Sequence, residues 1–335
     1  MLHVVDNPST NPYFNVALDS WLVRQAPSDQ DFVMLWRNRP AVIIGRYQNT
    51  HQEVNVEYAE DHDIAIVRRM SGGGAVYHDL GNLNFSLIVS TKDHSFNDYE
   101  SFTRPVIAAL AYYGVKAELQ GRNDVTLAGK KFSGNAQYRT ASRLLHHGTI
   151  LFDEDLDVVP QVLEVRQDKI ATKGIKSVRS RITNIRPYLP ADINLAKFRG
   201  TLLKFLGEYN GGISGEYDLA SPQLRQIEAW VSQRFGQWSW NFGQSPPFNY
   251  TGRERFPKGE LEVRVNVVHG VIQHMTIYGD FLGNQAVDPL LGSLNGVTYS
   301  HESVELALQE IRVEDYLGGI TRSEFLKVLF DMTPT

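Results

Sequence analysis

The segment at 68–79, which reads RRMSGGGAVYHD, constrains this chain more than any other feature because it follows an apolar, strand-like run at 64–67. Its three consecutive glycines lack a Cβ, so the backbone can adopt positive φ angles and turn successive N–H groups toward one anion. Arg69 adds a guanidinium that can hold a phosphate or carboxylate through two parallel hydrogen bonds. The segment therefore predicts an anion-binding loop. The alternative, a tight connection between strands, is equally typical of a glycine run taken alone.

Length and charge narrow the class of protein. At 335 residues the chain exceeds the size at which one core usually stops growing, so a large domain with a smaller one is expected. Asp and Glu total 38 against 33 Lys and Arg, and the formal net charge of -5 gives no general attraction for nucleic acid. The first residues do not form a signal peptide, and no apolar run reaches the length of a membrane helix. We therefore expect a cytoplasmic protein that binds neither nucleic acid nor membrane.

The sequence contains no cysteine, which excludes disulfides, thiolate metal sites and a cysteine nucleophile. The adjacent His146 and His147 make a poor zinc site because neither cysteine nor glutamate lies near them. Neighbouring strand residues point to opposite faces, so one of these imidazoles can line a pocket while the other packs or faces water.

Apolar spacing and turn residues predict mixed helices and strands up to the paired prolines at 246–247 and a compact α+β unit after them. The predicted helices cover 12–25, 53–61, 96–113, 156–165, 195–209, 222–235, 303–308 and 323–330. The predicted strands cover 32–36, 41–44, 64–67, 84–89 and 130–138, and a hairpin joins 260–267 to 271–278. Asn11 and Pro12 give the first helix a cap and a proline at its first position.

Two lysines follow a predicted hairpin turn at Ala128 and Gly129. Strand alternation puts Lys130 and Lys131 on opposite faces, so one of them can point inward. The alternative is an ordinary solvated pair after a turn. Asp124, shortly before this turn, can orient a phosphate or a metal-bound water, and its alternative role is an Asx turn.

The segment at 169–181 carries five cations and shows no clean periodicity. Loops of this length inside a compact domain are commonly functional, which predicts a mobile basic lid. A solvated surface loop is the alternative.

Taken together, these motifs closely resemble the bacterial lipoate-protein ligase A family. The resemblance rests on the ordered blocks NPYFNVALD, RRMSGGGAVYHDLGN, GRNDV, KKFSGNAQYR, HHGT, KGIKSVRSRITNI and WNFGQSPPF, which span 11–248. It implies an α/β (α+β) fold with a catalytic domain related to biotin protein ligases and class II aminoacyl-tRNA synthetases at 1–244. A small α+β accessory domain is implied at 248–335.

The resemblance also implies a reaction in two halves. Lipoate and ATP, with Mg2+, give lipoyl-AMP and pyrophosphate, and the lipoyl group then passes to a specific lysine of an acceptor protein. The implied acceptors are the lipoyl domains of 2-oxoacid dehydrogenase E2 subunits and the glycine cleavage H protein. Because the substrate carboxylate must approach the α-phosphate, a positive charge has to offset the repulsion between two anions.

Site residues follow from matching the family's motifs to this sequence. Lys131 is the implied catalytic residue. The implied ATP contacts are Arg69, Gly74, Ala75, Val76, Tyr77 and Lys131, and the implied lipoate contacts are Lys131, Arg69, Gly73 and His147. The predicted adenylate lid contains Lys173, Gly174, Lys176, Ser177, Val178 and Arg179, and Asp124 is the candidate metal ligand.

Three rival functions are weighed against these motifs. Acyl transferases that form an acyl-enzyme need a cysteine thiolate, which this chain lacks. Biotin protein ligases carry a GRGR-type loop before their pocket, where this chain has RMSGGG. A binding module that keeps the adenylate pocket without turnover is the non-enzymatic alternative, and the presence of Lys131, Asp124 and the basic segment argues against it.

Overall fold

The computed structural model describes residues 1–163, 178–242, 249–331 and 333–334, which form two compact units. The first unit contains Met1–Ile44, Thr50–Arg68 and Ala75–Asn241, and the second contains Gly45–Asn49, Arg69–Gly74 and Phe242–Thr335. Two short pieces of the N-terminal half therefore belong to the second unit, so the division is not a single cut in the chain.

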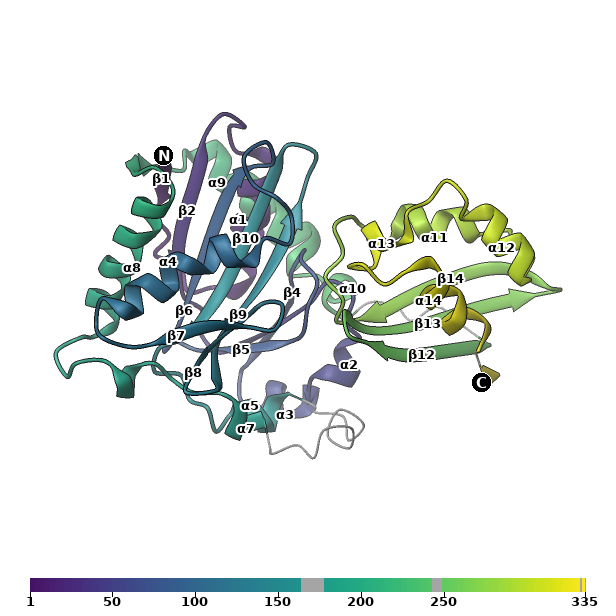
Figure 1. The fold of residues 1–335 in the computed structure, drawn as a ribbon, viewed down its shortest axis with the longest axis horizontal. Coiled ribbons are helices and arrows are strands. Elements are labelled where there is room, and N and C mark those ends of the chain that lie inside the picture. Colours follow the sequence, from purple (N-terminus) through teal and green to yellow (C-terminus); the bar gives the residue numbers. More distant parts are fainter. Residues whose placement is uncertain (164–177, 243–248, 332, 335) are drawn as a thin grey trace. The chain divides into compact units, whose positions relative to one another are not determined.

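An eight-stranded sheet dominates the first unit, with the order β11-β1-β2-β6-β10-β9-β8-β7 (Figure 1). β1 pairs in parallel with β2 and β11, and the other neighbouring strands are antiparallel. The bounds are β1 Leu2–Val5, β2 Asp31–Trp36, β6 Asn82–Ser90, β7 Ala117–Gln120, β8 Asp124–Leu127, β9 Lys130–Arg139, β10 Arg143–Leu151 and β11 Ile213–Tyr217. A three-stranded sheet has the order β4-β3-β5, with β3 Ala41–Ile44, β4 Ala65–Arg68 and β5 Val76–His78.

Helices cover both faces of the large sheet (Figure 1). α4 (Tyr99–Ala111) and α8 (Leu195–Tyr209) pack on one face, and α1 (Pro12–Gln25) packs on the other. The remaining helices of this unit are α2 Thr50–Glu53, α3 Val56–Asp61, α5 Val159–Val162, α7 Val178–Arg181, η1 Arg186–Tyr188, α9 Ser221–Trp230, η2 Val231–Phe235 and α10 Trp238–Asn241. The predicted α/β fold class is confirmed.

The two faces of the large sheet differ in chemistry. Along β6, Leu83, Phe85 and Leu87 join the apolar core beneath α4 and α8. Alternate residues point the other way, so Asn84 and Ser86 lie buried on the face that α1 covers. A buried polar face is costly unless its groups are hydrogen-bonded or bind something, which makes this face the place to look for a site.

Local signals account for several elements. Asn11 Oδ1 accepts the N–H of Tyr13 and Pro12 begins α1, as the sequence predicts. The helix predicted at 195–209 is confirmed as α8. Ala128 and Gly129 have φ angles of 50° and 73°, so the predicted hairpin turn is confirmed, with positive φ at both central residues.

Other predicted boundaries are wrong for identifiable reasons. The helix predicted at 53–61 begins later, at Val56, because Asn55 accepts the N–H of Tyr58 and caps it, and Glu53 ends the preceding helix α2. The helix predicted at 96–113 begins at Tyr99, where Asp98 caps it. Of the helix predicted at 156–165, only Val159–Val162 is helical among the described residues. The segment predicted as one helix at 222–235 is α9 followed by the π-helical turn η2.

The second unit is built on a four-stranded antiparallel sheet with the order β14-β13-β12-β15. Its elements are β12 Tyr250–Phe256, β13 Gly259–Val268, β14 Val271–Gly279, α11 Asp288–Leu294, α12 His301–Ala307, α13 Val313–Tyr316, α14 Arg322–Phe330 and β15 Thr333–Pro334. The predicted hairpin is confirmed as β13 and β14, and the helices bury Phe325 and Leu329 in a core shared with Val263.

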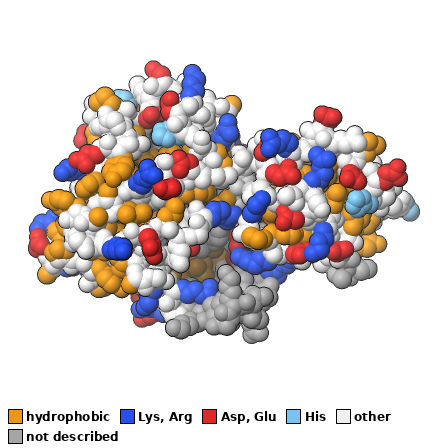
Figure 2. All heavy atoms as spheres, viewed as in Figure 1, with side chains coloured by type: hydrophobic (Ala, Val, Ile, Leu, Met, Phe, Trp, Pro, Cys, Tyr) orange, Lys and Arg blue, Asp and Glu red, His pale blue; other side chains and the backbone are white. Residues whose placement is uncertain are grey.

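Acidic and basic side chains are interspersed over the surface shown in Figure 2 rather than gathered by sign. No helix within the described ranges combines the length and apolar character needed to cross a bilayer.

Candidate active site

Lys131 and Asp124 form an ion pair on neighbouring strands of the large sheet. Lys131 Nζ lies 2.7 Å from Asp124 Oδ1, and the two side chains are 36% and 39% exposed. The side chain of Lys130, by contrast, is exposed to solvent. The predicted opposite orientation of the two lysines is therefore confirmed, and Lys131 has a carboxylate beside it.

A β-bulge sets the direction of Lys131. Asp124 pairs with Gly134 and Thr126 pairs with Lys131. Between these two pairs β9 has two residues where β8 has one. The extra residue, Phe132, is fully buried in the apolar core. Paired residues share a face, so Lys131 and Gly134 lie on the same face although they are three positions apart.

A row of side chains crosses the polar face from β2 to β9. Trp36 pairs with Asn84, Asn84 pairs with Thr149, and Thr149 Oγ1 accepts the N–H of Gly134 at 3.1 Å. We call Trp36, Asn84, Thr149 and Gly134 the polar row. It spans three strand spacings, about 14 Å, and the Lys131–Asp124 pair lies at its β8–β9 end.

His147 lies in the next row, where it contacts helix α1. Its Nδ1 donates to Asp19 Oδ2 at 2.6 Å, and both side chains are largely buried. Ser86, its cross-strand partner, accepts a hydrogen bond from Trp36 Nε1 at 2.9 Å. Asp19 was not predicted from the sequence, where its only signal is a carboxylate within an apolar stretch of a helix.

His146 points to the opposite face and is a core residue. Its ring stacks on Phe102 with centroids 4.6 Å apart, its Nε2 donates to Asn135 Oδ1, and its Nδ1 accepts from Gln137. Burial lowers the pKa of His146 well below its usual range, so the ring is neutral. One imidazole of the pair therefore packs, and only His147 reaches the polar face.

Three buried polar atoms on this face have no hydrogen-bond partner among the described residues, namely Asp19 Oδ1, Asn82 Oδ1 and Asn84 Nδ2. Such atoms cost free energy unless a ligand or water satisfies them. They make the polar face a candidate binding surface.

Ala75, Val76 and Tyr77 lie in or just before β5 of the first unit. Tyr77 pairs with Val42 and is only 6% exposed. Burial, with a smaller effect of Asp79 and Glu154, raises the pKa of the Tyr77 phenol, which stays neutral.

Glu154 is a buried carboxyl near Tyr77. Its Oε2 has no hydrogen-bond partner among the described residues, and burial raises its pKa well above the usual 4.5, with Asp79 and Asp155 adding to the effect. Above pH 4.5 the unfolded chain releases this proton while the folded protein keeps it up to its higher pKa. Stability is therefore lost as pH rises through that interval.

We expect Glu154→Gln, whose side chain cannot ionise, to stabilise the protein by at least about 1 kcal/mol at about pH 8 and by little at about pH 4. Urea unfolding of both proteins across this range measures the difference. An equal effect at both ends would show that folding does not shift the pKa of Glu154.

The three glycines of the loop serve different purposes. Among the three glycines only Gly73 has a positive φ, 91°, whereas a side chain on Gly72 would clash with the carbonyl of Phe281. Arg69 is 7% exposed, and its Nη2 donates to the carbonyls of Gly72 and Gly74 at 2.7 and 2.8 Å. Close backbone approach thus requires the glycine at position 72 and turning requires the one at position 73, while the anion-binding role of the loop stays a prediction.

The loop residues Arg69, Gly73 and Gly74 belong to the second unit, whereas Lys131, Asp124, His147 and 75–77 belong to the first. The ligand contacts predicted for Arg69, Gly73 and Gly74 stay predictions. In the structure, Arg69 holds the loop's own carbonyls.

Trp240 and Asn241 join the segment just before this loop to the end of the first unit. Asn241 Oδ1 accepts the N–H of Arg68 at 2.9 Å, and Trp240 Nε1 donates to the carbonyl of Arg68 at 2.9 Å. These residues lie more than 170 positions apart in the chain. Trp240 and Asn241, the first two residues of the WNFGQSPPF block, therefore have a structural role at the end of β4.

The predicted lid falls mostly outside the described residues, which is the case for Lys173, Gly174, Lys176 and Ser177. Val178 begins α7, and Arg179 Nε lies 2.8 Å from Asp157 Oδ1 on the surface. Beyond α7, the N–H of Thr183 donates to the carbonyl of Lys131 at 2.9 Å. The residues that directly follow α7 are thus hydrogen-bonded to β9, the strand that carries Lys131.

The metal prediction rests on Asp124 alone. Within the described residues no group of three or more His, Asp or Glu side chains is placed to hold a metal ion. A single carboxylate can still serve Mg2+, which commonly binds one or two carboxylates together with substrate phosphates and water.

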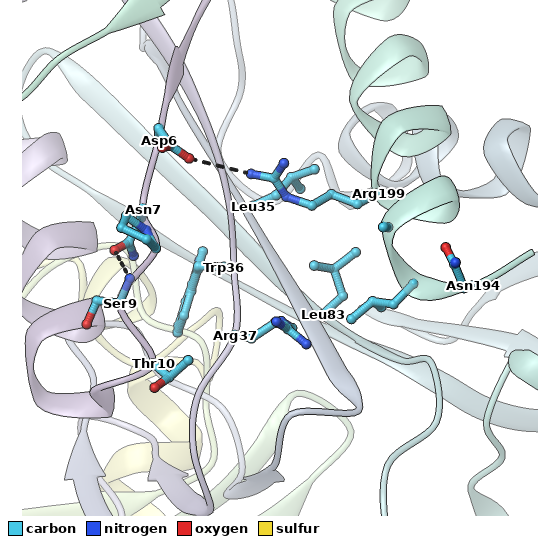
Figure 3. Close-up of a pocket in the computed structure, with 13 residues that line it drawn as sticks. Asp6, Asn7, Ser9, Thr10, Leu35, Trp36, Arg37, Leu83, Asn194 and Arg199 are labelled. Atoms are coloured by element: carbon cyan, nitrogen blue, oxygen red, sulfur yellow. Dashed lines mark hydrogen bonds and ion pairs between the residues drawn. The ribbon is translucent and has the colours of Figure 1, made fainter.

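A cavity of about 490 Å³ lies at the ends of β1 and β2, beside the start of α8 (Figure 3). Its rim carries Arg37 and Arg199, and Arg199 Nη2 lies 4.0 Å from Asp6 Oδ1. Its lining includes Trp36 of the polar row, but none of the residues predicted to bind ATP or lipoate. The polar face is therefore the better candidate for the active site.

Comparisons with family models cover most of the chain. A model described as "Lipoyl protein ligase A/B catalytic domain" matches residues 11–207, and one described as "Bacterial lipoate protein ligase C-terminus" matches 245–329. The chain is 40% identical to the lipoate-protein ligase LplJ of Bacillus subtilis over 328 residues, which is 97% of this chain and 99% of that protein.

Solved structures agree. The chain resembles P. falciparum LipL1 in complex with lipoate, with a TM-score of 0.76 and 26% identity over 92% of this chain and 94% of that one. A lipoate-protein ligase A bound with ATP gives a TM-score of 0.64 and 26% identity over 72% and 99% of the two chains. The bipartite ligase of Thermoplasma acidophilum, described with its E2 lipoyl domain, gives 0.66 and 27% identity over 73% and 98%.

Proposed function

The chain belongs to the lipoyl protein ligase A/B family, and from this premise we propose how its residues carry out the reaction. The protein is a lipoate-protein ligase, an enzyme that uses ATP to attach lipoate to lipoyl domains. We propose that it acts in the cytoplasm, and that the glycine cleavage H protein is an acceptor besides the E2 lipoyl domains. The proposed catalytic domain covers 1–244 and the accessory domain 248–335.

The observation that carries the residue assignment is the Lys131 ammonium at the end of the polar row. It already pairs with a carboxylate, Asp124, at 2.7 Å. The substrate presents the same chemical group, and it must come close to the α-phosphate of ATP, which is also an anion. An ammonium held at this position offsets their repulsion, and it stabilises charge that develops as the two react.

In the first half-reaction a carboxylate oxygen of lipoate attacks the α-phosphorus. The new O–P bond forms as the bond to the bridging oxygen breaks, and pyrophosphate leaves. In the second, the amine of the acceptor lysine attacks the acyl carbon, the C–O bond to AMP breaks, and the amine loses a proton. In our proposal Lys131 contacts the carboxylate and the α-phosphate.

The acyl chain would cross the polar face. Water or the polar end of the substrate would satisfy Asp19 Oδ1 and Asn84 Nδ2, which an alkyl chain cannot do. A chain that starts at Lys131 would run along Thr149 and Asn84 toward the His147–Asp19 pair. In the proposal Ala75, Val76 and Tyr77 contact the nucleotide, and Arg69 with Gly73 and Gly74 binds phosphate or carboxylate oxygens. Asp124 would supply the single carboxylate for Mg2+, which when bound screens the charge of the departing pyrophosphate.

ATP–pyrophosphate exchange tests this proposal when lipoate, octanoate and biotin are supplied in turn. We expect exchange with lipoate and none with biotin, and octanoate shows whether the pocket distinguishes a dithiolane from a plain alkyl chain. Absence of exchange with every acid would favour a binding module without turnover.

A further inference from the structure

Gly134 lies directly beneath the side chain of Lys131. A Cβ built on Gly134 would be 2.9 Å from both Cε and Nζ of Lys131 and 3.9 Å from Asp124 Oδ1. Carbon atoms in folded proteins pack at about 3.5–4.0 Å, so an alanine there and the present Lys131 conformation exclude each other.

Space, rather than backbone conformation, is what requires a glycine here. Gly134 is absent from the residues with positive φ, so any amino acid can adopt its backbone angles. Its N–H donates to Thr149 Oγ1 at 3.1 Å, and its neighbours Ser133 and Asn135 are buried. The backbone is therefore held in place, and a new methyl group would displace the flexible end of Lys131 instead.

The bulge at Phe132 explains why the two residues meet. In a regular strand, residues three apart point to opposite faces. The extra residue turns Lys131 onto the face of Gly134, and the lysine side chain then lies back along its own strand.

We propose that Gly134 is a positioning residue for the adenylation step: its missing side chain leaves the space in which the Lys131 ammonium lies at the end of the polar row. This inference rests on the function proposed for Lys131. Gly134 itself does not contact the reacting atoms, and it affects the reaction only by leaving space for the side chain of Lys131.

A double-mutant cycle tests the proposal, using full-length protein and lipoate-dependent ATP–pyrophosphate exchange. We expect Gly134→Ala to lower kcat by about 100-fold, the scale on which a misplacement of about 1 Å acts, with little change in melting temperature. In a Lys131→Ala background the same substitution should change kcat by less than about twofold, because residues that act as a unit are not additive. Gly200→Ala is the matched control, since Gly200 is exposed in α8 and nothing lies within 4 Å of its added Cβ.

Each outcome separates the hypotheses. An equal loss from Gly134→Ala with and without Lys131, or no loss in either background, overturns the positioning role. Full activity of Lys131→Ala alone overturns the function assigned to Lys131, and with it this inference. Gly134→Ala could also melt far below the parent protein, and the double variant then gives the answer. If removal of Lys131 restores the melting temperature, the added methyl group clashes with Lys131. If it does not, the destabilisation comes from another contact and the proposal is overturned.

Discussion

Lys131→Ala is expected to lower lipoate-dependent ATP–pyrophosphate exchange by at least about 100-fold, since removing one preorganised donor costs about 3 kcal/mol of transition-state stabilisation. The folded state should be nearly unaffected. Among the described residues, the only ion pair lost is with Asp124. Both side chains are more than one-third exposed, where such pairs contribute about 0–1 kcal/mol. Initial-rate exchange and a thermal melt on the same preparation measure the two effects separately.

Lys130→Ala is the matched control for this experiment. Lys130 precedes Lys131 in the same strand and is exposed, so its removal changes the net charge identically without touching the polar row. Similar losses from both variants would mean that exchange responds to overall charge, and Lys131 would lose its assigned role.

Asn241→Ala is expected to destabilise the first unit by about 3 kcal/mol, which is the cost of leaving two buried groups without partners. The side chain of Asn241 accepts the N–H of Arg68 at 2.9 Å and donates to the carbonyl of Phe235 at 2.7 Å. Asn241 is 2% exposed and Phe235 is fully buried, so water cannot easily replace the lost bonds. The melting temperature should fall by roughly 6–12 °C.

Ser239→Ala is the control within the same short helix, because Ser239 is exposed. Urea unfolding of both variants gives the difference in the free energy of unfolding. A loss below about 0.5 kcal/mol for Asn241→Ala, the range of ordinary surface substitutions, would contradict the structural role of Asn241.

The elements that could be predicted from sequence are those specified by neighbouring residues. Asn11 and Pro12 fix the start of α1, and Ala128 and Gly129 fix the hairpin turn. Strand β11 was not predicted, because Gly215 and Glu216 give it neither apolar alternation nor high strand propensity. It forms because β1, some 200 positions earlier, offers it a parallel edge.

The candidate site divides in the same way. Lys131 and His147 could be identified from motifs, and the alternation argument correctly separated each from its neighbour. Asp19 and Gly134 could not, because each acquires its role from a contact that local sequence does not encode. Asp19 meets His147 from 128 positions away, and Gly134 meets Lys131 only because Phe132 interrupts the regular strand.

β6 and its neighbouring strands bury apolar side chains on one face of the sheet and polar side chains on the other. Stability depends on Leu83, Phe85 and Leu87 under α4 and α8, whereas Asn84, Ser86 and their partners lie on the opposite side of the same strands. If this face binds the acid as proposed, substitutions that alter the accepted acid can accumulate at alternate positions while the apolar packing under α4 and α8 is retained. The range of accepted acyl groups and the stability of the domain can then change independently.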